Sequence, residues 1–590
     1  MATTKKRPSR DQRAPRERTS RTKEAAVAVA ALQPRTSWGP YAALAAGAFI
    51  VLCWAYAPAM HGPFLFDDNG LRFALPNFDA PLATWLRGVR PLLMFTYWLN
   101  VKLSGSDTFS YHTVNLLFHS IATGLMFLIV RRLLEWSGAD KTLRDLLAGF
   151  AAAIFLLHPV ETEAVAYLAG RSDGLSVMLL LGAYAVFLYR RNTAVSWRDS
   201  LSLLFIFAAS LLAKEHAIVL PALFLLTDYW WNPGFSLAGA RRNWRLYAPL
   251  AAGAVGGFLI FLPLIRHGSN AGFGLKDLTW YQYFFTQCRA LFVYPALFLF
   301  PVHQSADWDF PMSKTIFDRG AVFGLIALLA LAALAWRYRH RYRLAAFGFL
   351  TYLLLMAPTS SFLPIRDAIA ERRLYLSMLG LLLILVDFLG RWNLERKTLA
   401  AICASIVLIL GAATYARAQV WSSDLALWQD TTEKTPGNWR AHFHLASAYY
   451  NLGRCDTAVN EFENTTKLRP PDYDLLVDWA LALDCLNQSD GALAKLRQAA
   501  ALEQTAHVYS QIGMIYGKRR QWREALDALA TAEKLGPNFA TTYVYRGLVH
   551  TATNQPEAAI QDYRRALAID PKYQQALDGL AQAQTLLARH

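Results

Sequence analysis

The strongest constraint on the fold of this chain is a series of apolar blocks, each about 15 to 22 residues long and separated by polar turns. An α-helix rises about 1.5 Å per residue, so one such block is long enough to cross the hydrocarbon core of a bilayer. Apolar residues make up 54% of the chain and charged residues 17%, proportions that are unusual for soluble domains. The sequence therefore predicts an all-α, polytopic membrane helix bundle.

The formal net charge of +16 is concentrated at the N-terminus and in the turns between apolar blocks. Residues 1–38 contain ten Lys or Arg, three acids and no apolar stretch long enough to cross a membrane, so we expect a disordered cytoplasmic tail close to anionic lipid. This distribution fits membrane topology better than nucleic-acid binding, and no nucleic-acid partner is expected. Block 41–60 is too long and too far from the start for a cleaved signal peptide, so we expect a signal anchor.

Basic residues are concentrated in alternate turns, which the positive-inside rule assigns to the cytoplasm. Block 280–301 would place the basic run 336–343 outside if it crossed, so we expect that block to be re-entrant or interfacial. Gln287 and Arg289 within it would be costly at mid-bilayer. Eleven crossings then place the C-terminus outside. The expected spans are residues 41–60, 113–130, 145–157, 173–189, 200–213, 217–231, 246–264, 319–336, 344–358, 374–390 and 398–414.

The C-terminal quarter, residues 438–590, contains an internal repeat. Small residues recur at intervals of 34, 33 and 34, and again twelve positions later in each unit, where the two helices of a unit must approach closely. The small residues are Ala446, Ala480, Gly513 and Gly547, followed by Ala458, Ala492, Ala525 and Ala559. This pattern predicts four tetratricopeptide repeats and a cap helix, joined by a linker at 416–437 to a membrane domain at 39–415.

Such a stack usually presents a concave groove to a peptide or protein, although it could also serve only as a packing platform for the membrane domain.

The five cysteines show no metal-ligand spacing. Cys455 and Cys485 lie in the repeat region. They could pair if the repeats face an oxidising compartment, but sequence alone does not supply disulfide geometry, and we expect two unpaired thiols.

Four predicted external loops carry mixed acids and bases at the mouths of the spans, whereas the predicted cytoplasmic loops are mainly basic. The candidate site residues in these loops are Asp67, Asp68, Arg90, His112, His158, Glu163, Arg171, Asp173, Lys214, Glu215, Glu371 and Arg372. Each residue also has a structural interpretation: Lys214 could extend along apolar surface to reach water, Glu371 could pair with Arg372, and His158 could cap a helix. The recurrence of mixed charge on one face favours function.

Carboxylates and cations at an external membrane surface suit a group transfer from a lipid carrier. A carboxylate can take a proton from an attacking hydroxyl, and arginine or lysine can hold a leaving phosphate. Nucleotide-activated donors are absent outside the cell, and the chain contains no phosphate-binding GxxxxGK[ST] loop. The sequence therefore favours a lipid-linked donor.

The order of motifs is FDDNG, RPLLMFTYWLN, YHTVNLLFH, HPVETEAVAYLAGRSD, AKEHAIVLPALFLLTD, YPALFLFP and AERRLYLSMLG, followed by the repeats. From about residue 61 to the end, this order resembles the transmembrane and tetratricopeptide repeat-containing protein O-mannosyltransferases, glycosyltransferases of the GT-C fold. The resemblance implies a polyprenyl-phosphate-linked sugar donor, mannose above all, and Ser or Thr hydroxyls of exported proteins as acceptors. It implies no metal and no other cofactor.

In this resemblance, Asp67 and Asp68 match the acidic pair of the first external loop, and one of them is expected to be the catalytic base. The cations expected around the leaving phosphate are Arg90, His158, Arg171, Lys214 and Arg372. The acids expected to orient these cations or to contact the sugar are Glu163, Asp173, Glu215 and Glu371, and His112 is included among the substrate-binding residues.

The short repeat array suggests a bacterial member, in the inner membrane with its repeats in the periplasm, where the sugar could differ from mannose. One alternative is a ligase or polymerase that joins a lipid-linked saccharide to another glycan. A second is a non-catalytic membrane scaffold whose repeats assemble envelope proteins. A transporter is disfavoured, because its charged residues should lie within the spans near mid-bilayer.

Overall fold

The computed structural model describes residues 39–74, 80–232, 234–267 and 272–589, and within these ranges it contains helices and no strand. The predicted tail at 1–38 lies outside the described residues. The chain divides into two compact units, residues 1–51 and 52–590. The described part of the first unit is the start of helix α2 (Gly39–Tyr56), and every other described element lies wholly in the second unit.

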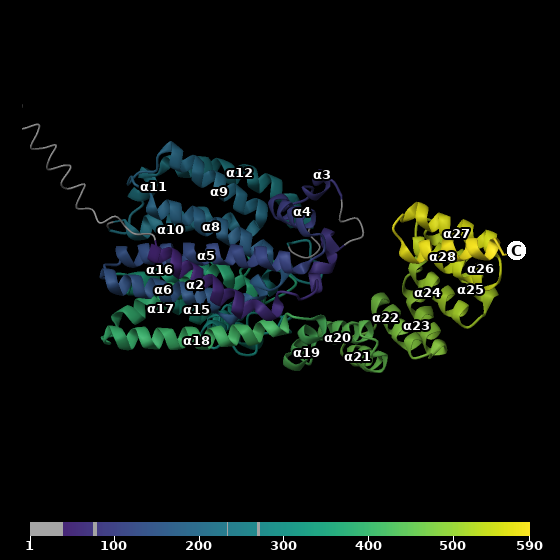
Figure 1. Cartoon of the computed structure of the whole chain (residues 1–590). Coiled ribbons are helices and arrows are strands. Elements are labelled where there is room, and N and C mark those ends of the chain that lie inside the picture. The colour runs from purple at the N-terminus through teal and green to yellow at the C-terminus, as the bar shows by residue number, and fades with distance from the viewer. Residues whose placement is uncertain (1–38, 75–79, 233, 268–271, 590) are drawn as a thin grey trace, which may run out of the picture. The chain divides into compact units, whose positions relative to one another are not determined.

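Each of the eleven apolar blocks coincides with helical structure (Figure 1). After α2, the corresponding helices are α5 (Thr108–Trp136), α6 (Lys141–Leu157), α8 (Arg171–Tyr189), α9 (Trp197–Ala213), α10 (Leu220–Trp231), α12 (Trp244–His267), α15 (Ala321–Arg337), α16 (Arg343–Met356), α17 (Leu374–Arg391) and α18 (Arg396–Val420). Shorter helices between them are α3 (Leu82–Trp85), α4 (Pro91–Ser104), α7 (Thr162–Val165), α11 (Ala238–Arg242), α13 (Trp280–Ala290) and α14 (Val293–Leu299).

Six helices in the described part are long and apolar enough to cross a membrane, or seven if the bent pair Lys141–Leu157 and Pro159–Val165 forms one span. The chain is accordingly an integral membrane protein. The count of eleven spans stays a prediction, because several of the matching helices, such as α10 with 12 residues, are short for a full crossing. Block 280–301 consists of the two short helices α13 and α14.

Apolar side chains on the outside of the bundle support a lipid environment. In the window of α15 only 6% of the residues are buried, and Phe323 and Leu329 are 73% and 61% exposed. In water, such an apolar surface would promote association or aggregation.

Within the bundle, α16 and α17 approach closely at Gly348 and Gly380. A Cβ on either glycine would lie 2.5 to 2.6 Å from the carbonyl oxygen of the other. Small residues at helix contacts are typical of membrane bundles.

Residues 439–587 form helix pairs whose register matches the sequence repeat. The pairs are α20 (Trp439–Asn451) with α21 (Cys455–Leu468), α22 (Tyr473–Cys485) with α23 (Ser489–Leu502), α24 (Ala506–Lys518) with α25 (Trp522–Leu535), and α26 (Ala540–Ala552) with α27 (Pro556–Ile569), followed by α28 (Gln574–Leu587). All eight repeated small residues are buried. A Cβ at Gly513 would lie 2.6 Å from Leu529, which explains why a small residue is needed there. Helix α19 (Asp424–Lys434) occupies part of the expected linker.

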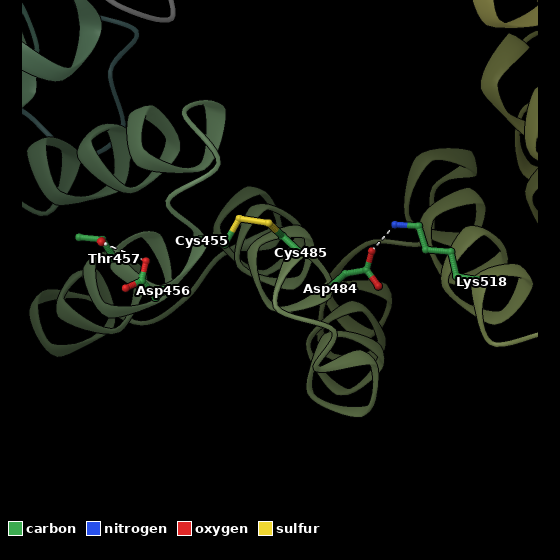
Figure 2. Close-up of a disulfide and its surroundings, with 6 residues drawn as sticks. All are labelled: Cys455, Asp456, Thr457, Asp484, Cys485 and Lys518. Atoms are coloured by element: carbon green, nitrogen blue, oxygen red, sulfur yellow. Dashed lines mark hydrogen bonds and ion pairs between the residues drawn. A yellow bond between two sulfur atoms is a disulfide. The ribbon is translucent and has the colours of Figure 1, made fainter.

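The prediction of two unpaired thiols in the repeats was wrong. Cys455 and Cys485 form a disulfide, with their Cα atoms 6.1 Å apart (Figure 2). The bond joins the start of α21 to the end of α22 and so fastens the first helix pair to the second. Sequence spacing alone could not indicate this approach, which depends on how consecutive pairs stack. Structural disulfides persist in oxidising compartments, in agreement with the expected external position of the repeats.

We expect the disulfide to stabilise the first two repeats by roughly 3.5 kcal/mol, because it closes a loop of 30 residues in the unfolded chain. Adding a reductant should lower the thermal unfolding midpoint of the purified chain but leave that of the Cys455→Ser/Cys485→Ser variant unchanged. Cys53→Ser serves as the control for loss of a thiol. An equal response to reductant in the wild type and the double variant would contradict this expectation.

Candidate functional site

The acidic pair lies in a short 3-10 helix, Phe66–Gly70, beyond the end of α2. Asp68 is 1% exposed, and its carboxylate accepts hydrogen bonds from the backbone N–H groups of Leu65 at 3.0 Å and Ala169 at 2.7 Å. Burial raises the pKa of Asp68 to about 7, although the two N–H donors act in the opposite direction. Asp68 thus holds the loop to the turn that precedes α8.

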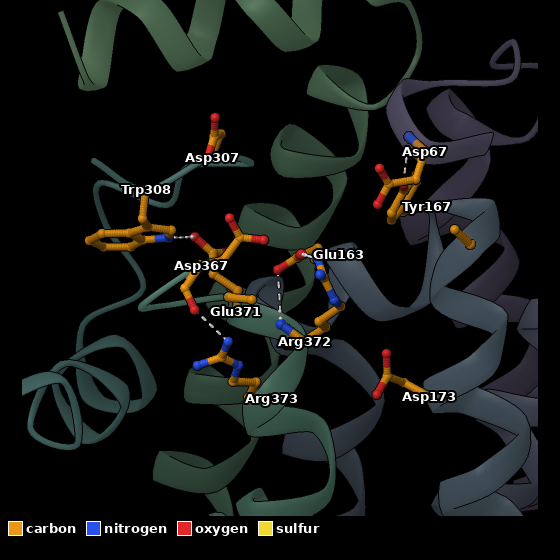
Figure 3. A network of polar contacts seen from close by, with 12 residues as sticks. Asp67, Glu163, Tyr167, Asp173, Asp307, Trp308, Asp367, Glu371, Arg372 and Arg373 are labelled. Carbon is orange, nitrogen blue, oxygen red and sulfur yellow. Dashed lines mark hydrogen bonds and ion pairs between the residues drawn. The ribbon is translucent and has the colours of Figure 1, made fainter. Parts of the chain in front are cut away.

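Asp67 differs from its neighbour because its side chain is exposed. Its backbone N–H donates to the Tyr167 hydroxyl at 2.9 Å, which fixes the backbone while leaving the carboxylate accessible (Figure 3). Tyr167 also lies within electrostatic reach of Arg372. Of the two aspartates, Asp67 has the carboxylate that could reach a bound molecule.

Asp173, in the first turn of α8, is buried and receives two basic side chains from the turn after α9. Lys214 Nζ donates to its Oδ2 at 2.6 Å, and His216 Nδ1 lies 3.6 Å from its Oδ1. Burial lowers the pKa of Lys214 despite the attraction of Asp173, and it lowers the pKa of His216 to about 4. At neutral pH His216 is therefore uncharged, and Lys214 is the cation that balances Asp173.

Two further ion pairs lie beside this one. Arg90, immediately before α4, binds Glu215 through two parallel hydrogen bonds, Nε to Oε1 at 2.9 Å and Nη2 to Oε2 at 2.8 Å. Arg372 pairs with Glu163 and also donates its backbone N–H to Glu163 Oε2 at 2.9 Å (Figure 3). Burial opposes ionisation of Glu215, but the hydrogen bonds and charge of Arg90 hold its pKa below the ordinary value.

These contacts bring together three cations, Arg90, Lys214 and Arg372, each of which interacts electrostatically with Asp173. Each cation has one carboxylate partner, so the cluster is close to neutral. The pairing fixes the direction of each cation. It leaves further N–H groups free for another acceptor, because Lys214 carries three donors and Arg90 uses only two of its nitrogens on Glu215. Oriented cations of this kind can bind an anionic group.

Unlike these three cations, Arg171 is fully buried. Its guanidinium lies 4.5 Å from the ring centre of Tyr97 and donates to Asn100 at 2.6 Å and Asn115 at 2.8 Å. These contacts tie α8 to α4 and α5 from within the protein. The geometry favours a supporting role for Arg171 over contact with a substrate.

The two predicted histidines and Glu371 are also inside the protein. His112 is 2% exposed. His158 Nε2 bonds the carbonyl of Phe298 at 3.0 Å, and its Nδ1 accepts the N–H of Val160, so it caps the short helix after α6. Glu371 accepts hydrogen bonds from Gln304 and from Ser305 and Trp308 of the loop before α15. Both oxygens of Glu371 are therefore engaged by the protein, and Figure 3 shows Glu371 with one of these partners, Trp308.

Sequence reasoning missed a contact between the acidic loop and the first repeat. Phe66, which has a left-handed backbone with φ of 49°, packs edge-on against Trp428 of α19 and His444 of α20, at ring-centre distances of 5.3 and 5.8 Å. Trp428 and His444 stack on each other at 4.4 Å. Aromatic residues in a linker and a repeat are too common to single out, so only the fold reveals that they touch the residue before Asp67.

A polar contact reinforces the same junction. Arg440 of α20 pairs with Asp307 and Asp367, which lie in the two loops beside Glu371. Asn438 donates to the carbonyl of Asp307 at 3.2 Å, and Lys434 donates to the carbonyl of Gln304 at 2.8 Å. The start of the repeat region is thus bonded to the loops that surround the candidate site.

Comparison with known proteins supports the resemblance of the motifs. A family model described as tetratricopeptide repeat matches residues 511–573. A protein O-mannosyl-transferase of Caenorhabditis elegans is 24% identical over 447 residues, covering 70% of this chain and 61% of the relative. Protein O-mannosyl-transferase TMTC1 of Homo sapiens is 27% identical over 503 residues, covering 73% and 55%. Among solved structures, the TPR protein YrrB covers 31% of this chain and 88% of its own, at 21% identity and a TM-score of 0.23.

The chain spans 55% to 61% of the length of these curated relatives. The similarity nevertheless extends over most of the chain, and includes both the membrane helices and repeats. The curated homologues of this chain are therefore protein O-mannosyl-transferases, the family that its motif order resembles.

Proposed function

We propose that this chain is a membrane glycosyltransferase that moves a sugar, expected to be mannose, from a polyprenyl-phosphate-linked donor to Ser or Thr hydroxyls of exported proteins. The proposal rests on the accessible carboxylate of Asp67 together with the three oriented cations around Asp173. Tyr167 connects the two, because it accepts the backbone N–H of Asp67 and lies within electrostatic reach of Arg372. The names of the curated homologues agree with it. The site lies at the end of the bundle that we propose faces the outside, where the donor's phosphate would lie at headgroup level.

In this proposal, the reaction is a single displacement with Asp67 as general base. The Asp67 carboxylate takes the proton of the acceptor hydroxyl while that oxygen forms a bond to the anomeric carbon. The bond between the anomeric carbon and the phosphate oxygen breaks, and its electron pair leaves with the polyprenyl phosphate. Asp67 then releases its proton to water, so that the sugar is transferred with inversion.

Asp67 is preferred to Asp68 as the base because of its accessibility. Both oxygens of Asp68 are occupied by backbone donors, and its side chain is 1% exposed, so it would have to leave its site to reach an acceptor. We assign Asp68 the role of fixing the loop. A general base must come within hydrogen-bonding distance of the proton it removes, and the exposed Asp67 can do so.

The leaving phosphate gains negative charge as the sugar departs, and Arg90, Lys214 and Arg372 would stabilise that charge. Their carboxylate partners keep them oriented before the donor binds, so little reorganisation is needed during the reaction. Glu163, Asp173 and Glu215 therefore act through the cations in this scheme.

The repeats would hold the acceptor protein, and their junction with the acidic loop would align it with Asp67. Trp428 and His444 support Phe66, so movement of the first repeat would be transmitted to the residue next to the base. This contact gives the repeats a direct part in the site beyond recruitment.

We expect Asp67→Asn to lower transfer of radiolabelled mannose from polyprenyl-phosphate mannose by about 10²- to 10⁴-fold, because the amide cannot accept the proton. Transfer would be measured with the purified chain in proteoliposomes and protein extract as acceptor. Asp107→Asn, another aspartate of the same external segment, is the matched control and should retain full transfer. Full activity of Asp67→Asn, with loss only in Asp68→Asn, would exchange the roles of the two aspartates.

The acceptor pool separates this proposal from its alternatives. Label on protein supports protein O-glycosylation, whereas label only on saccharide would favour a glycan ligase or polymerase. No transfer from mannose or from other lipid-linked sugars would leave the membrane scaffold as the function.

We expect His444→Ala to lower kcat for transfer by about tenfold without a change in the donor's KM, because the loop that orients Asp67 loses its support. His444→Phe should retain activity, since it keeps the aromatic stack on Trp428. His550→Ala, in the fourth repeat, controls for loss of a repeat histidine. A parallel rise in the donor's KM, or failure of His444→Phe to restore kcat, would contradict a positioning role.

A further inference from the structure

At the opposite end of the bundle from Asp67, the helices line a partly open polar cavity of about 430 Å³. Helix α8 begins beside the candidate site with Asp173 and ends at the cavity with Arg190, a distance of about 25 Å along the helix. The cavity is therefore separate from the site described above, and the proposed function does not use it. By the expected topology, it opens toward the cytoplasm.

Five arginines from four segments of the chain and a single carboxylate supply the charged groups of this cavity. They are Arg132 of α5, Arg190 and Arg191 after α8, Arg242 of α11, Arg343 of α16, and Asp228 of α10. Asp228 is already engaged, since it accepts hydrogen bonds from Asn243 at 2.6 Å and Tyr247 at 2.8 Å. Arg190 forms an ion pair with Asp228 at 3.6 Å, and Arg132 forms one with Glu135 at 2.9 Å. The other three arginines of the cavity have no ion-pair partner among the residues that the structure describes, so the cavity keeps an excess of positive charge.

Some of these arginines are fixed by the protein and others are free to bind. Arg343 donates to the carbonyl of Trp230 at 2.7 Å, and Arg132 donates to that of Leu188 at 3.3 Å, which holds both guanidinium groups in place. The buried Nε atoms of Arg190 and Arg343 have no hydrogen-bond partner among the described residues. Within the ranges that the structure describes, Arg191 and Arg242 are exposed and form no ion pair.

Tryptophans place this cavity at the level of a membrane interface. Trp136 and Trp231 line it with their ring centres 5.8 Å apart, and the indole N–H of Trp231 is buried without a partner. Arg343 lies 4.7 Å from the ring centre of Trp231. Tryptophan is enriched at membrane interfaces, where its ring packs with lipid and its N–H meets polar groups.

We propose that this cavity binds the phosphate of an anionic membrane lipid. Guanidinium groups bind phosphate oxygens in pairs, and basic pockets between transmembrane helices on the cytoplasmic side bind anionic headgroups. The unpartnered Nε atoms and the Trp231 N–H supply donors for such an anion. A lipid is favoured over soluble phosphate because the cavity lies at the ends of α5 and α8, two helices long and apolar enough to cross the membrane.

The test is lipid retention by the purified full chain, measured by native mass spectrometry. Detergent-solubilised protein is mixed with equal amounts of phosphatidylglycerol and phosphatidylcholine that carry the same acyl chains. We expect the wild type to retain phosphatidylglycerol in about tenfold preference, and Arg191→Gln/Arg242→Gln to lose most of that preference. These two arginines form no ion pair in the described structure, so their removal leaves no carboxylate without its partner.

Arg198→Gln/Arg241→Gln is the matched control, because it removes the same charge from exposed arginines at this end of the bundle that do not line the cavity. It should keep the lipid preference. An unchanged preference in Arg191→Gln/Arg242→Gln, or an equal loss in the control, would overturn the proposal. Calorimetric binding of inorganic phosphate that depends on Arg191 and Arg242, without retention of phosphatidylglycerol, would also overturn it by showing that the anion is soluble.

Discussion

Two backbone N–H groups, those of Leu65 and Ala169, donate to the buried carboxylate of Asp68, and the candidate site depends on these two hydrogen bonds. They tie the loop after α2 to the turn before α8, two segments that are far apart in the sequence. Arg171 lies below this turn and anchors it to α4 and α5 through Asn100 and Asn115. Asp67 owes its exposed position to this arrangement, because its neighbour is held inside.

The three cations around Asp173 are also held in place by buried or partly buried carboxylates. In a partly buried site an unpaired charge would be costly, so each cation is held by one carboxylate and the cluster stays near neutrality. A donor with a single phosphate then meets N–H groups that already point in fixed directions. The bundle provides this arrangement at one end. At the other end it places a second group of five arginines, three of which have no ion-pair partner within the described part of the chain.

Much of this organisation could be predicted from sequence, because it depends on periodic features. The apolar blocks coincide with helices, and the 34-residue register of small residues coincides with buried positions such as Ala446 and Gly513. Pairwise contacts were harder to predict. The candidate residues looked alike in the sequence, but the structure exposes Asp67, buries Arg171, and uses His158 as a helix cap.

These differences arise from tertiary packing, which leaves little trace in local sequence. The disulfide between Cys455 and Cys485 depends on the stacking of two helix pairs. The contact of Phe66 with Trp428 and His444 depends on where the first repeat lies against the loops of the membrane domain. No spacing rule connects residues that are separated by more than 350 positions.

The stereochemistry of transfer tests the central claim most directly. Nuclear magnetic resonance of the glycosylated product, formed from a donor of known anomeric configuration, would give the configuration at the transferred sugar. A single displacement assisted by Asp67 predicts that the product has the opposite configuration to the donor. Retention would contradict this account, because a single displacement from the face opposite the leaving phosphate always inverts the anomeric carbon.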